Sequence, residues 1–294
     1  MMESILPLQA KKPVNKLKKP FKQNNLRIQL IEAINDVLPT KKHALYQAGK
    51  IHFQNYGKLI RGITALMISD AIGLDKRCAM NWALAVELMH NASLVHDDIC
   101  DGDTYRRANN TVWSAISERS AICFGDWLVA KSFEAALDCA LMSDGKKIEA
   151  VRELARTMRN LCEGQSNEFT KTPITSWESY DKLVLAKTAS LIVAAGEGPL
   201  ILGEVNACQF NIKKALCHLG VAYQIHNDID DILGKNLQCF RGDMKRRAPN
   251  AVTVAFKNLH INDSKFQFMD WISSNDTHEI AYWVQKFIDS DALE

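Results

Sequence analysis

The sequence predicts an all-α fold, a single large helical bundle with buried central helices. Only seven of the 294 residues are proline, and none lies between Pro39 and Pro173. Proline interrupts helices, so a long stretch without it, rich in Ala, Leu, Met, Glu and Lys, favours long helices. Alternating strand patterns bounded by turn residues are absent. Three segments are apolar on most faces, as helices in the middle of a bundle are: residues 82–95, 121–142 and 182–195.

Taken in order, the expected helices cover most of residues 26–294, which we assign to one domain. They lie near residues 26–37, 41–54, 60–73, 76–96, 111–118, 121–142, 146–170, 176–197, 199–205, 211–232, 248–258, 264–273 and 276–288. Residues 1–25 carry six lysines against one glutamate, together with three prolines. They hold no continuous apolar run, so we expect a basic, disordered arm and not a signal peptide.

Composition argues against several classes of protein. The formal net charge is only +2, so nothing global indicates nucleic-acid binding. The eight cysteines show no CxxC and no zinc-type spacing, so we expect reduced, mostly buried thiols in a cytoplasmic protein. The longest apolar run, residues 183–203, is interrupted by Lys187 and Glu197 and contains Gly196, Gly198 and Pro199. It is therefore not expected to span a membrane.

A first acidic cluster lies in LVHDDICDGDTYRR, residues 94–107, at the end of an apolar helical segment. It holds Asp97, Asp98, Asp101, Asp103, Arg106 and Arg107. Residues four apart share a helix face, so Asp97 and Asp101 should point the same way, with Asp98 beside them. Crowded carboxylates repel unless a cation lies between them, and Mg²⁺ is typically held by one or two carboxylates plus substrate phosphates. The two arginines would grip phosphate oxygens. The alternative is a solvated acidic loop.

A second acidic cluster lies in YQIHNDIDDILG, residues 223–234, again behind an apolar helical segment. Asn227, Asp228 and Asp231 repeat the spacing of the first cluster, and Gln224 lies one turn before Asp228. Two metal-competent clusters on separate apolar helices predict a central cavity with acids on two facing walls.

Other candidate residues are less specific when each is taken alone. Lys187 is a cation inside an apolar helix, where an unpaired ammonium is costly, so it should face a partner anion. Lys58 and Arg61 precede an apolar helix, but no strand and no GxxxxGK[ST] motif accompany them, so they form no P-loop. His90 is by default a core histidine. It forms an ExxH with Glu87, but a di-iron bundle needs a second such motif, which is absent.

With these motifs in order, the chain resembles the trans-isoprenyl diphosphate synthases (polyprenyl synthetases), in particular the geranylgeranyl diphosphate synthase-like members. The resemblance covers about residues 50–258. The shared motifs are GKLIR at 57–61, MHNASLVHDDICD at 89–101, DTYRRANNTVW at 103–113, GDW at 125–127, EGQ at 163–165, KT at 187–188, YQIHNDIDD at 223–231 and GDMKRRAPN at 242–250. It implies the isoprenoid synthase fold, a homodimer, and isopentenyl diphosphate and an allylic diphosphate as substrates.

The resemblance also assigns roles to individual residues. Three Mg²⁺ ions per active site would be bound by the two acidic clusters, at Asp97, Asp98, Asp101, Asn227, Asp228 and Asp231. The allylic diphosphate would be held by Arg106, Lys187, Thr188, Gln224 and Lys235, and isopentenyl diphosphate by Lys58, Arg61, His90 and Arg107. Direct roles in catalysis would fall to Asp97, Asp98, Asp101, Lys187, Gln224 and Asp228.

The chain departs from the family pattern at several places. The family's GGKxxRP reads YGKLIRG here, with Tyr56 and Gly62 in place of Gly and Pro, and RRG becomes RRA, with Ala108 in place of Gly. The second cluster opens with Asn227, where the family usually has Asp. An amide oxygen can ligate Mg²⁺ but brings no charge, so we expect a weaker metal site there. The chain also ends sooner than many relatives, so fewer closing helices are expected.

Three functions compete at this point. A chain-elongating prenyltransferase is favoured because the isopentenyl-site cations Lys58, Arg61 and Arg107 are all present. A terpene cyclase of the same fold would need only one diphosphate, so these cations would be surplus. A non-catalytic partner subunit of a prenyl synthase is favoured only by Asn227 and the short end of the chain.

The helix before the first cluster predicts the length of the product. Positions four and eight residues upstream of the cluster lie about 6 and 12 Å deeper along its face. Ser93 and its neighbour Ala92 are small, where the family's fifteen-carbon enzymes carry bulky aromatics, so they should not block a fifteen-carbon chain. Met89, one turn deeper, is the first side chain that could form a floor. We therefore expect a linear product of twenty carbons, with Phe124 or Trp127 as the floor if the product stops at fifteen.

Overall fold

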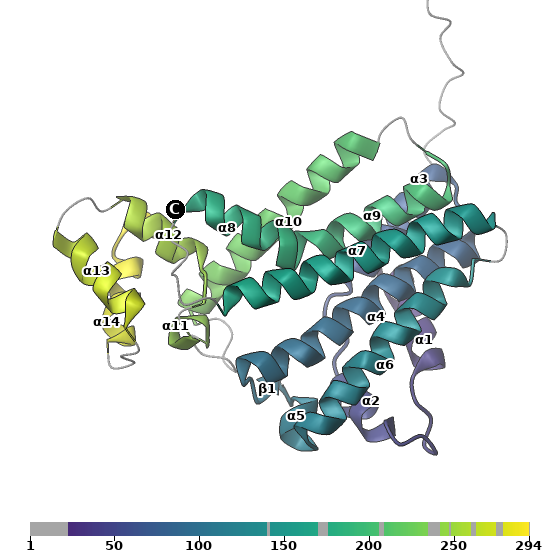
Figure 1. The fold of residues 1–294 in the computed structure, drawn as a ribbon, viewed down its shortest axis with the longest axis horizontal. Coiled ribbons are helices and arrows are strands. Elements are labelled where there is room, and N and C mark those ends of the chain that lie inside the picture. Colours follow the sequence, from purple (N-terminus) through teal and green to yellow (C-terminus); the bar gives the residue numbers. More distant parts are fainter. Residues whose placement is uncertain are drawn as a thin grey trace, which may run out of the picture.

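The computed structural model describes residues 23–139, 142–169, 176–205, 209–234, 242–246, 248–259, 263–274 and 279–293, and its architecture is all-α, as predicted (Figure 1). The first helices are α1 (Gln23–Val37), α2 (Tyr46–His52), α3 (Ile60–Ile72), α4 (Lys76–Asp101), α5 (Val112–Ala115), α6 (Glu118–Leu137) and α7 (Asp144–Glu168). Residues 1–22 of the predicted arm lie outside the described residues. Because α1 begins at Gln23, the assignment of residues 23–25 to the arm is wrong.

The second half of the chain continues with helices. They are α8 (Trp177–Val184), a π-helical turn (Leu185–Ala189), α9 (Ser190–Leu202), α10 (Gln209–Ile232), α11 (Gly242–Arg246), α12 (Ala251–Leu259), α13 (Asp263–Ser273), α14 (Ile280–Ile288) and a 3₁₀ turn (Asp291–Leu293). The described strands are β1 (Tyr105–Arg106) and β2 (Asn109–Asn110), which pair antiparallel and were not expected.

The central helix is α4, which packs against α1, α3, α6 and α9. The Asp75 carboxylate starts it by accepting the backbone N–H groups of Arg77 and Cys78, both at 3.0 Å. Trp82 is fully buried, and its ring N–H donates to the Ala194 carbonyl of α9 at 3.1 Å. The helix runs on to Asp101 instead of ending near residue 96, so the first acidic cluster occupies its last turns.

Helix α9 is almost entirely buried, and Pro199 lies inside it. The expected break that would begin a separate helix at residue 199 is therefore wrong. The combined helical stretch Trp177–Leu202 is long and apolar enough to cross a membrane by composition, but 78% of its apolar window is buried inside the molecule. That burial is typical of a core helix in a bundle.

Four clusters of buried apolar side chains hold the described helices together, and two of them are large. The larger core joins residues of α1–α4, α6, α7 and α9, and a smaller aromatic core joins the end of α10 to α12–α14. The assignment of residues 26–294 to one domain stays a prediction. The expectation of mostly buried thiols is wrong for the described cysteines, because only Cys78 and Cys139 are buried while Cys100, Cys123 and Cys162 are exposed.

Candidate active site

A cavity of about 870 Å³ lies between the first turn of α3, the end of α4 and the facing side of α10. Most of the predicted site residues line it: Lys58, Arg61, His90, Ser93, Asp97, Asp101, Arg106, Arg107, Lys187, Thr188, Gln224, Asn227 and Asp231. Leucines at 94, 161 and 191 give the wall an apolar part. Side chains from distant parts of the sequence therefore meet at one cavity, as the two clusters predicted.

Several predicted residues lie elsewhere. Asp98 and Asp228 are buried, at 2% and 0% exposure, and neither lines the cavity. Met89 and Ala92 are fully buried in the larger core, also outside the lining. Lys235 lies outside the described residues.

On the α4 wall, the first cluster divides between cavity and interior. Asp97 and Asp101 line the cavity, and burial together with the charge of Asp101 raises the pKa of Asp97 to about 6, although Lys187 opposes the shift. Asp98 turns inward and forms an ion pair with the Nε of Arg106. Burial raises the pKa of Asp98 to about 7 in spite of that arginine. A cation near Asp97 would favour its charged form.

Cations also line the cavity around the start of α3, where Lys58 and Arg61 lie. An Arg61 guanidinium nitrogen lies 3.1 Å from Nε2 of His90. Burial and the charge of Arg61 hold the pKa of His90 well below its ordinary value, so the neutral ring accepts this hydrogen bond. Behind them the buried Glu87 accepts the backbone N–H of Gly62 at 2.8 Å. That N–H belongs to the first turn of α3, where it has no partner within the helix.

The hairpin between β1 and β2 presents Arg106 and Arg107. Its two turn residues, Arg107 and Ala108, both have positive φ, 52° and 74°. Two-residue hairpins favour this geometry, but glycine adopts it more easily than alanine. The Arg107 guanidinium donates to the Asn55 carbonyl at 3.0 Å and lies beside Gly57, next to Lys58 in the sequence.

The π-helical turn carries Lys187 and Thr188 into the cavity. Lys187 forms an ion pair with Glu168 at the end of α7, so its predicted partner anion is present. Burial would lower the pKa of Lys187, but Glu168 and Asp97 outweigh burial and raise it. Gly164, within the EGQ motif, lets α7 approach this turn, because a Cβ at residue 164 would lie only 3.0 Å from the backbone nitrogen of Lys187. A single π turn is a frequent feature of functional sites.

The α10 wall offers oxygen ligands opposite the α4 acids. Asn227 and Asp231 line the cavity as predicted, and Asp230 joins them. In the part of the chain that the structure describes, no three His, Cys, Asp or Glu side chains converge closely enough to hold a metal ion alone. Mg²⁺ is usually bound by one or two carboxylates and completed by substrate phosphates. The paired oxygens on each wall therefore fit Mg²⁺ bound together with a diphosphate.

The sequence assigns no site role to four residues of the lining, Glu87, Tyr223, Asp230 and Arg246, and it places Asp103 only within the first acidic cluster. Arg246 of α11 reaches Asp103 at 2.9 Å and Asp101 at 3.7 Å, and so brings a late segment over the first cluster. Glu87 could have been found from its ExxH spacing to His90, and Tyr223 from its place one residue before Gln224. Arg246 is one of several cations after the second cluster, and nothing in the sequence singles it out.

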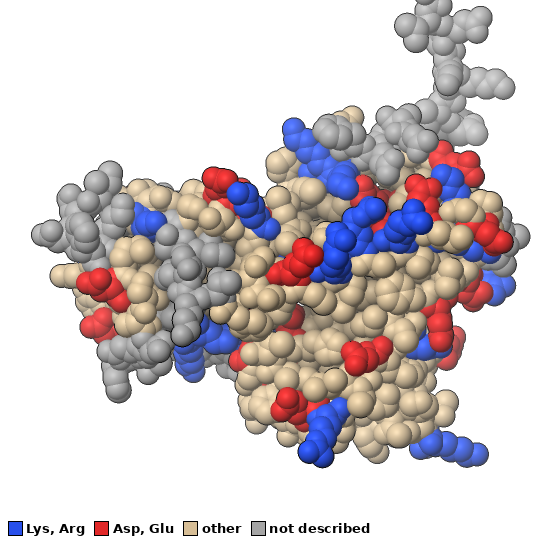
Figure 2. Space-filling model, viewed as in Figure 1, with Lys and Arg blue, Asp and Glu red and all other residues tan. Residues whose placement is uncertain are grey.

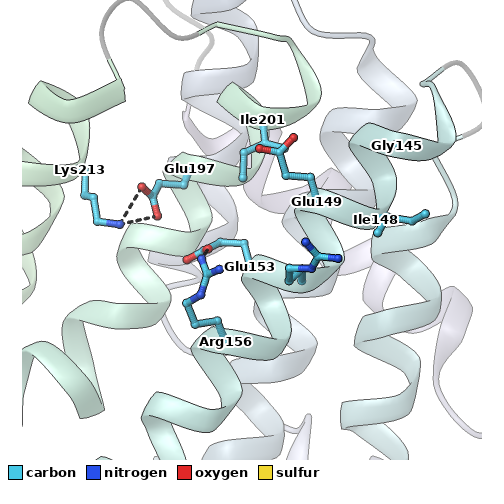
Figure 3. Close-up of a pocket in the computed structure, with 9 residues that line it drawn as sticks. Gly145, Ile148, Glu149, Glu153, Arg156, Glu197, Ile201 and Lys213 are labelled. Atoms are coloured by element: carbon cyan, nitrogen blue, oxygen red, sulfur yellow. Dashed lines mark hydrogen bonds and ion pairs between the residues drawn. The ribbon is translucent and has the colours of Figure 1, made fainter.

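A separate cavity of about 640 Å³ lies along α7, α9 and α10 and shares no lining residue with the first (Figure 3). In it Glu197, buried in the apolar α9, pairs with Lys213 at 3.0 Å. Nearby Glu153 pairs with Arg156. A buried carboxylate is tolerated when it is paired, so these contacts explain the charge inside α9.

Comparison with known proteins then decides the family. The sequence model of the family described as Polyprenyl synthetase matches residues 42–286. The chain belongs to the polyprenyl synthetase family. Geranylgeranyl pyrophosphate synthase from Geoglobus acetivorans is 34% identical to this polyprenyl synthetase over 214 residues, which are 69% of the present chain and 65% of that protein. The (2E,6E)-farnesyl diphosphate synthase of Mycobacterium tuberculosis strain H37Rv is 33% identical over 183 residues, 61% and 49% of the two chains.

A solved structure extends the likeness to nearly the whole chain. Geranylgeranyl pyrophosphate synthetase from Pyrococcus horikoshii superposes with a TM-score of 0.81 and 25% identity, covering 92% of this polyprenyl synthetase and 85% of that chain. The predicted isoprenoid synthase fold is confirmed. The matched region spans about half to two thirds of the length of the curated relatives named above.

Proposed function

We propose that this polyprenyl synthetase is a Mg²⁺-dependent trans-prenyltransferase that condenses isopentenyl diphosphate with an allylic diphosphate. The observation that carries the proposal is that one cavity is lined by two groups of charged residues. Arg61 contacts His90 and Arg107 lies against Gly57, next to Lys58, whereas Asp97 and Asp101 interact with Lys187. Two diphosphates need two such groups, whereas a cyclase would need one.

The chemistry follows from these two groups. Mg²⁺ bound with the diphosphate would neutralise charge on the departing group. Asp97, Asp101, Asn227 and Asp231 line the cavity, and they are the ligands proposed for the three ions that the resemblance implies. Lys187 adds fixed positive charge where the allylic C–O bond breaks and its electron pair passes to the diphosphate oxygen. The double bond of isopentenyl diphosphate attacks the allylic carbon, and a new C–C bond forms. A proton then leaves to the released diphosphate. The leucines of the lining exclude water that would quench the cation.

The deciding experiment incubates pure protein with Mg²⁺, an allylic diphosphate and labelled isopentenyl diphosphate. Labelled linear products support the proposal. Unlabelled cyclic hydrocarbon would indicate a cyclase, and absence of any product would indicate a non-catalytic partner subunit. Arg61→Met, which removes one cation of the isopentenyl site, should raise KM for isopentenyl diphosphate more than KM for the allylic diphosphate.

The product that we propose has twenty carbons. Ser93 lines the cavity, while Met89 and Ala92 are fully buried behind it on α4. Replacing Ala92 and Ser93 with Phe should shorten the product to fifteen carbons or fewer, and Met89→Ala should lengthen it. Leu88→Ala is the matched control, because it removes an equally buried side chain from another side of α4. Chromatography of the dephosphorylated products measures the outcome. If the wild-type product has fifteen carbons, the side chain that limits its length would instead be Phe124 or Trp127.

We further propose a homodimer formed through α6 and α7. Helix α6 exposes large apolar side chains, Ile122 and Leu137, at 43% and 48%, and Ile148 of α7, at 55%, lines the cavity of Figure 3. Figure 2 shows few charged side chains over the strip between α6 and α7. Exposed apolar patches of this kind mark interfaces. In sedimentation velocity, Ile122→Glu should give a monomer, and Met67→Glu, at a more exposed position on α3, should stay dimeric. A dimeric Ile122→Glu variant would contradict this interface.

A further inference from the structure

The second residue of the α10 cluster is held by the protein itself. Both carboxylate oxygens of Asp228 accept hydrogen bonds: Oδ2 from the Tyr180 hydroxyl at 2.6 Å and from the Ala251 backbone N–H at 2.8 Å, and Oδ1 from the Gln224 amide at 2.7 Å. Asp228 and Tyr180 are both 0% exposed. The carboxylate therefore joins α8, α10 and the start of α12 in the interior.

This anchor fixes the orientation of an amide at the cavity surface. Because Nε2 of Gln224 donates to Asp228, its Oε1 points the other way and accepts the Thr188 hydroxyl at 2.8 Å. Gln224 and Thr188 both line the cavity, and Thr188 lies on the π-helical turn beside Lys187. A chain of hydrogen bonds thus runs from Tyr180 through Asp228 and Gln224 to Thr188.

A metal ion would have to displace part of this hydrogen-bond chain to reach the carboxylate of Asp228. Removing Asp228 from its donors would leave the N–H of Ala251 buried without that acceptor. A buried donor left unsatisfied costs about 1–3 kcal/mol. Asn227 and Asp231, on the cavity side of the same helix, are reached without this loss.

We infer that Tyr180, acting through Asp228, is a positioning residue for Gln224 and Thr188, and that Asp228 is an internal anchor and not a metal ligand. The inference rests on the proposed function for its choice of substrate. Gln224 and Thr188 line the cavity together with Lys187, and all three are proposed to hold the allylic diphosphate. Loss of this hydrogen-bond chain should therefore weaken binding of the allylic diphosphate and leave binding of isopentenyl diphosphate unchanged.

The first test is kinetic and uses Tyr180→Phe, which removes only the hydroxyl. KM for the allylic diphosphate should rise about five- to ten-fold, the equivalent of one hydrogen bond. KM for isopentenyl diphosphate should stay within about two-fold of wild type. Tyr282→Phe, at an exposed tyrosine on α14, is the control and should change neither. An unchanged KM for the allylic diphosphate in Tyr180→Phe, or an equal rise in both constants, would overturn the positioning role.

The second test is calorimetric and needs no turnover, so it separates failure of this inference from failure of the proposed activity. Mg²⁺ is titrated into each variant at a saturating concentration of inorganic diphosphate. Asp97→Asn should raise the half-saturating Mg²⁺ concentration, whereas Asp228→Asn and Tyr180→Phe should leave it within about two-fold. A ten-fold rise confined to Asp228→Asn would show that Asp228 ligates Mg²⁺. If Asp228→Asn does not fold, Tyr180→Phe decides alone. A higher half-saturating Mg²⁺ concentration in Tyr180→Phe overturns the anchor role. An unchanged Mg²⁺ dependence together with weaker binding of diphosphate supports it.

Discussion

Replacing Gly62 with proline, the residue that the family pattern has there, should destabilise this protein. Gly62 is the third residue of α3, and its N–H donates to the buried carboxylate of Glu87 at 2.8 Å. Proline has no N–H to donate. Its Cβ would also lie 2.8 Å from Cγ of Glu87 and 2.4 Å from Cδ2 of Leu30, both too close. Glycine here lets a buried glutamate approach the start of α3, which carries Arg61.

The magnitude follows from these contacts. Losing the hydrogen bond to a buried carboxylate costs about 1–3 kcal/mol, and overpacking adds about 1–3 kcal/mol. Stiffening of the unfolded chain by proline returns about 0.4–1 kcal/mol. No helical hydrogen bond is lost, because Gly62 lies in the first turn. Gly62→Pro should therefore lower the free energy of unfolding by about 2–5 kcal/mol, and Gly62→Ala, which keeps the N–H, by about 1–3 kcal/mol.

Urea unfolding at fixed protein concentration measures both variants. A Glu87→Leu background supplies the control, because it removes the acceptor and cancels other effects of proline, such as the restriction on Arg61 before it. In the Glu87→Leu background, the difference in free energy of unfolding between the Gly62→Pro and Gly62→Ala variants should fall to less than half of its value in the wild-type background. If proline and alanine at this position cost the same in the presence of Glu87, the hydrogen bond contributes nothing and the reasoning is refuted.

Four further outcomes are expected. Asp97→Ala should lower kcat by about two to three powers of ten, with an unchanged circular dichroism spectrum, because charge stabilisation at the departing diphosphate is lost. Asn227→Asp should lower the Mg²⁺ concentration that gives half-maximal rate, and a higher concentration would contradict a ligand role. Asp230→Asn should raise that concentration. Ala108→Gly should increase the free energy of unfolding in urea by about 0.5–1 kcal/mol, since φ is 74° at this residue; a less stable variant would contradict strain in the hairpin.

Much of the fold and the site could be predicted from the sequence because local signals agree with the tertiary structure. The absence of proline between Pro39 and Pro173 marks the long helices α4, α6 and α7, and apolar surroundings mark the ones that are buried. Lys187 had to face an anion, and Glu168 is that anion. The ends of elements were less predictable. Pro199 stays inside α9, where burial among neighbouring helices outweighs the local preference to break.

The direction of neighbouring side chains could not be predicted from the clusters alone. Asp97 and Asp98 are adjacent in sequence but about 100° apart around the helix, so one faces the cavity and the other the interior. Which of them does so depends on packing against other helices. Likewise two partners of Asp228, Tyr180 and Ala251, are 48 and 23 residues away, and no spacing rule connects such residues.

The two clusters follow the same rule, and this bears on the departure at Asn227. In each, the first residue and the one four positions later line the cavity, and the second residue is buried against protein donors. Asn227 is therefore the counterpart of Asp97, and its neutral amide removes one charge from the α10 wall. Asp230, one turn on, also lines the cavity and brings a charge to the same wall. Because that charge is already present, Asn227→Asp adds to an acidic wall and does not create one, so its effect on Mg²⁺ dependence should be smaller than the effect of losing Asp97.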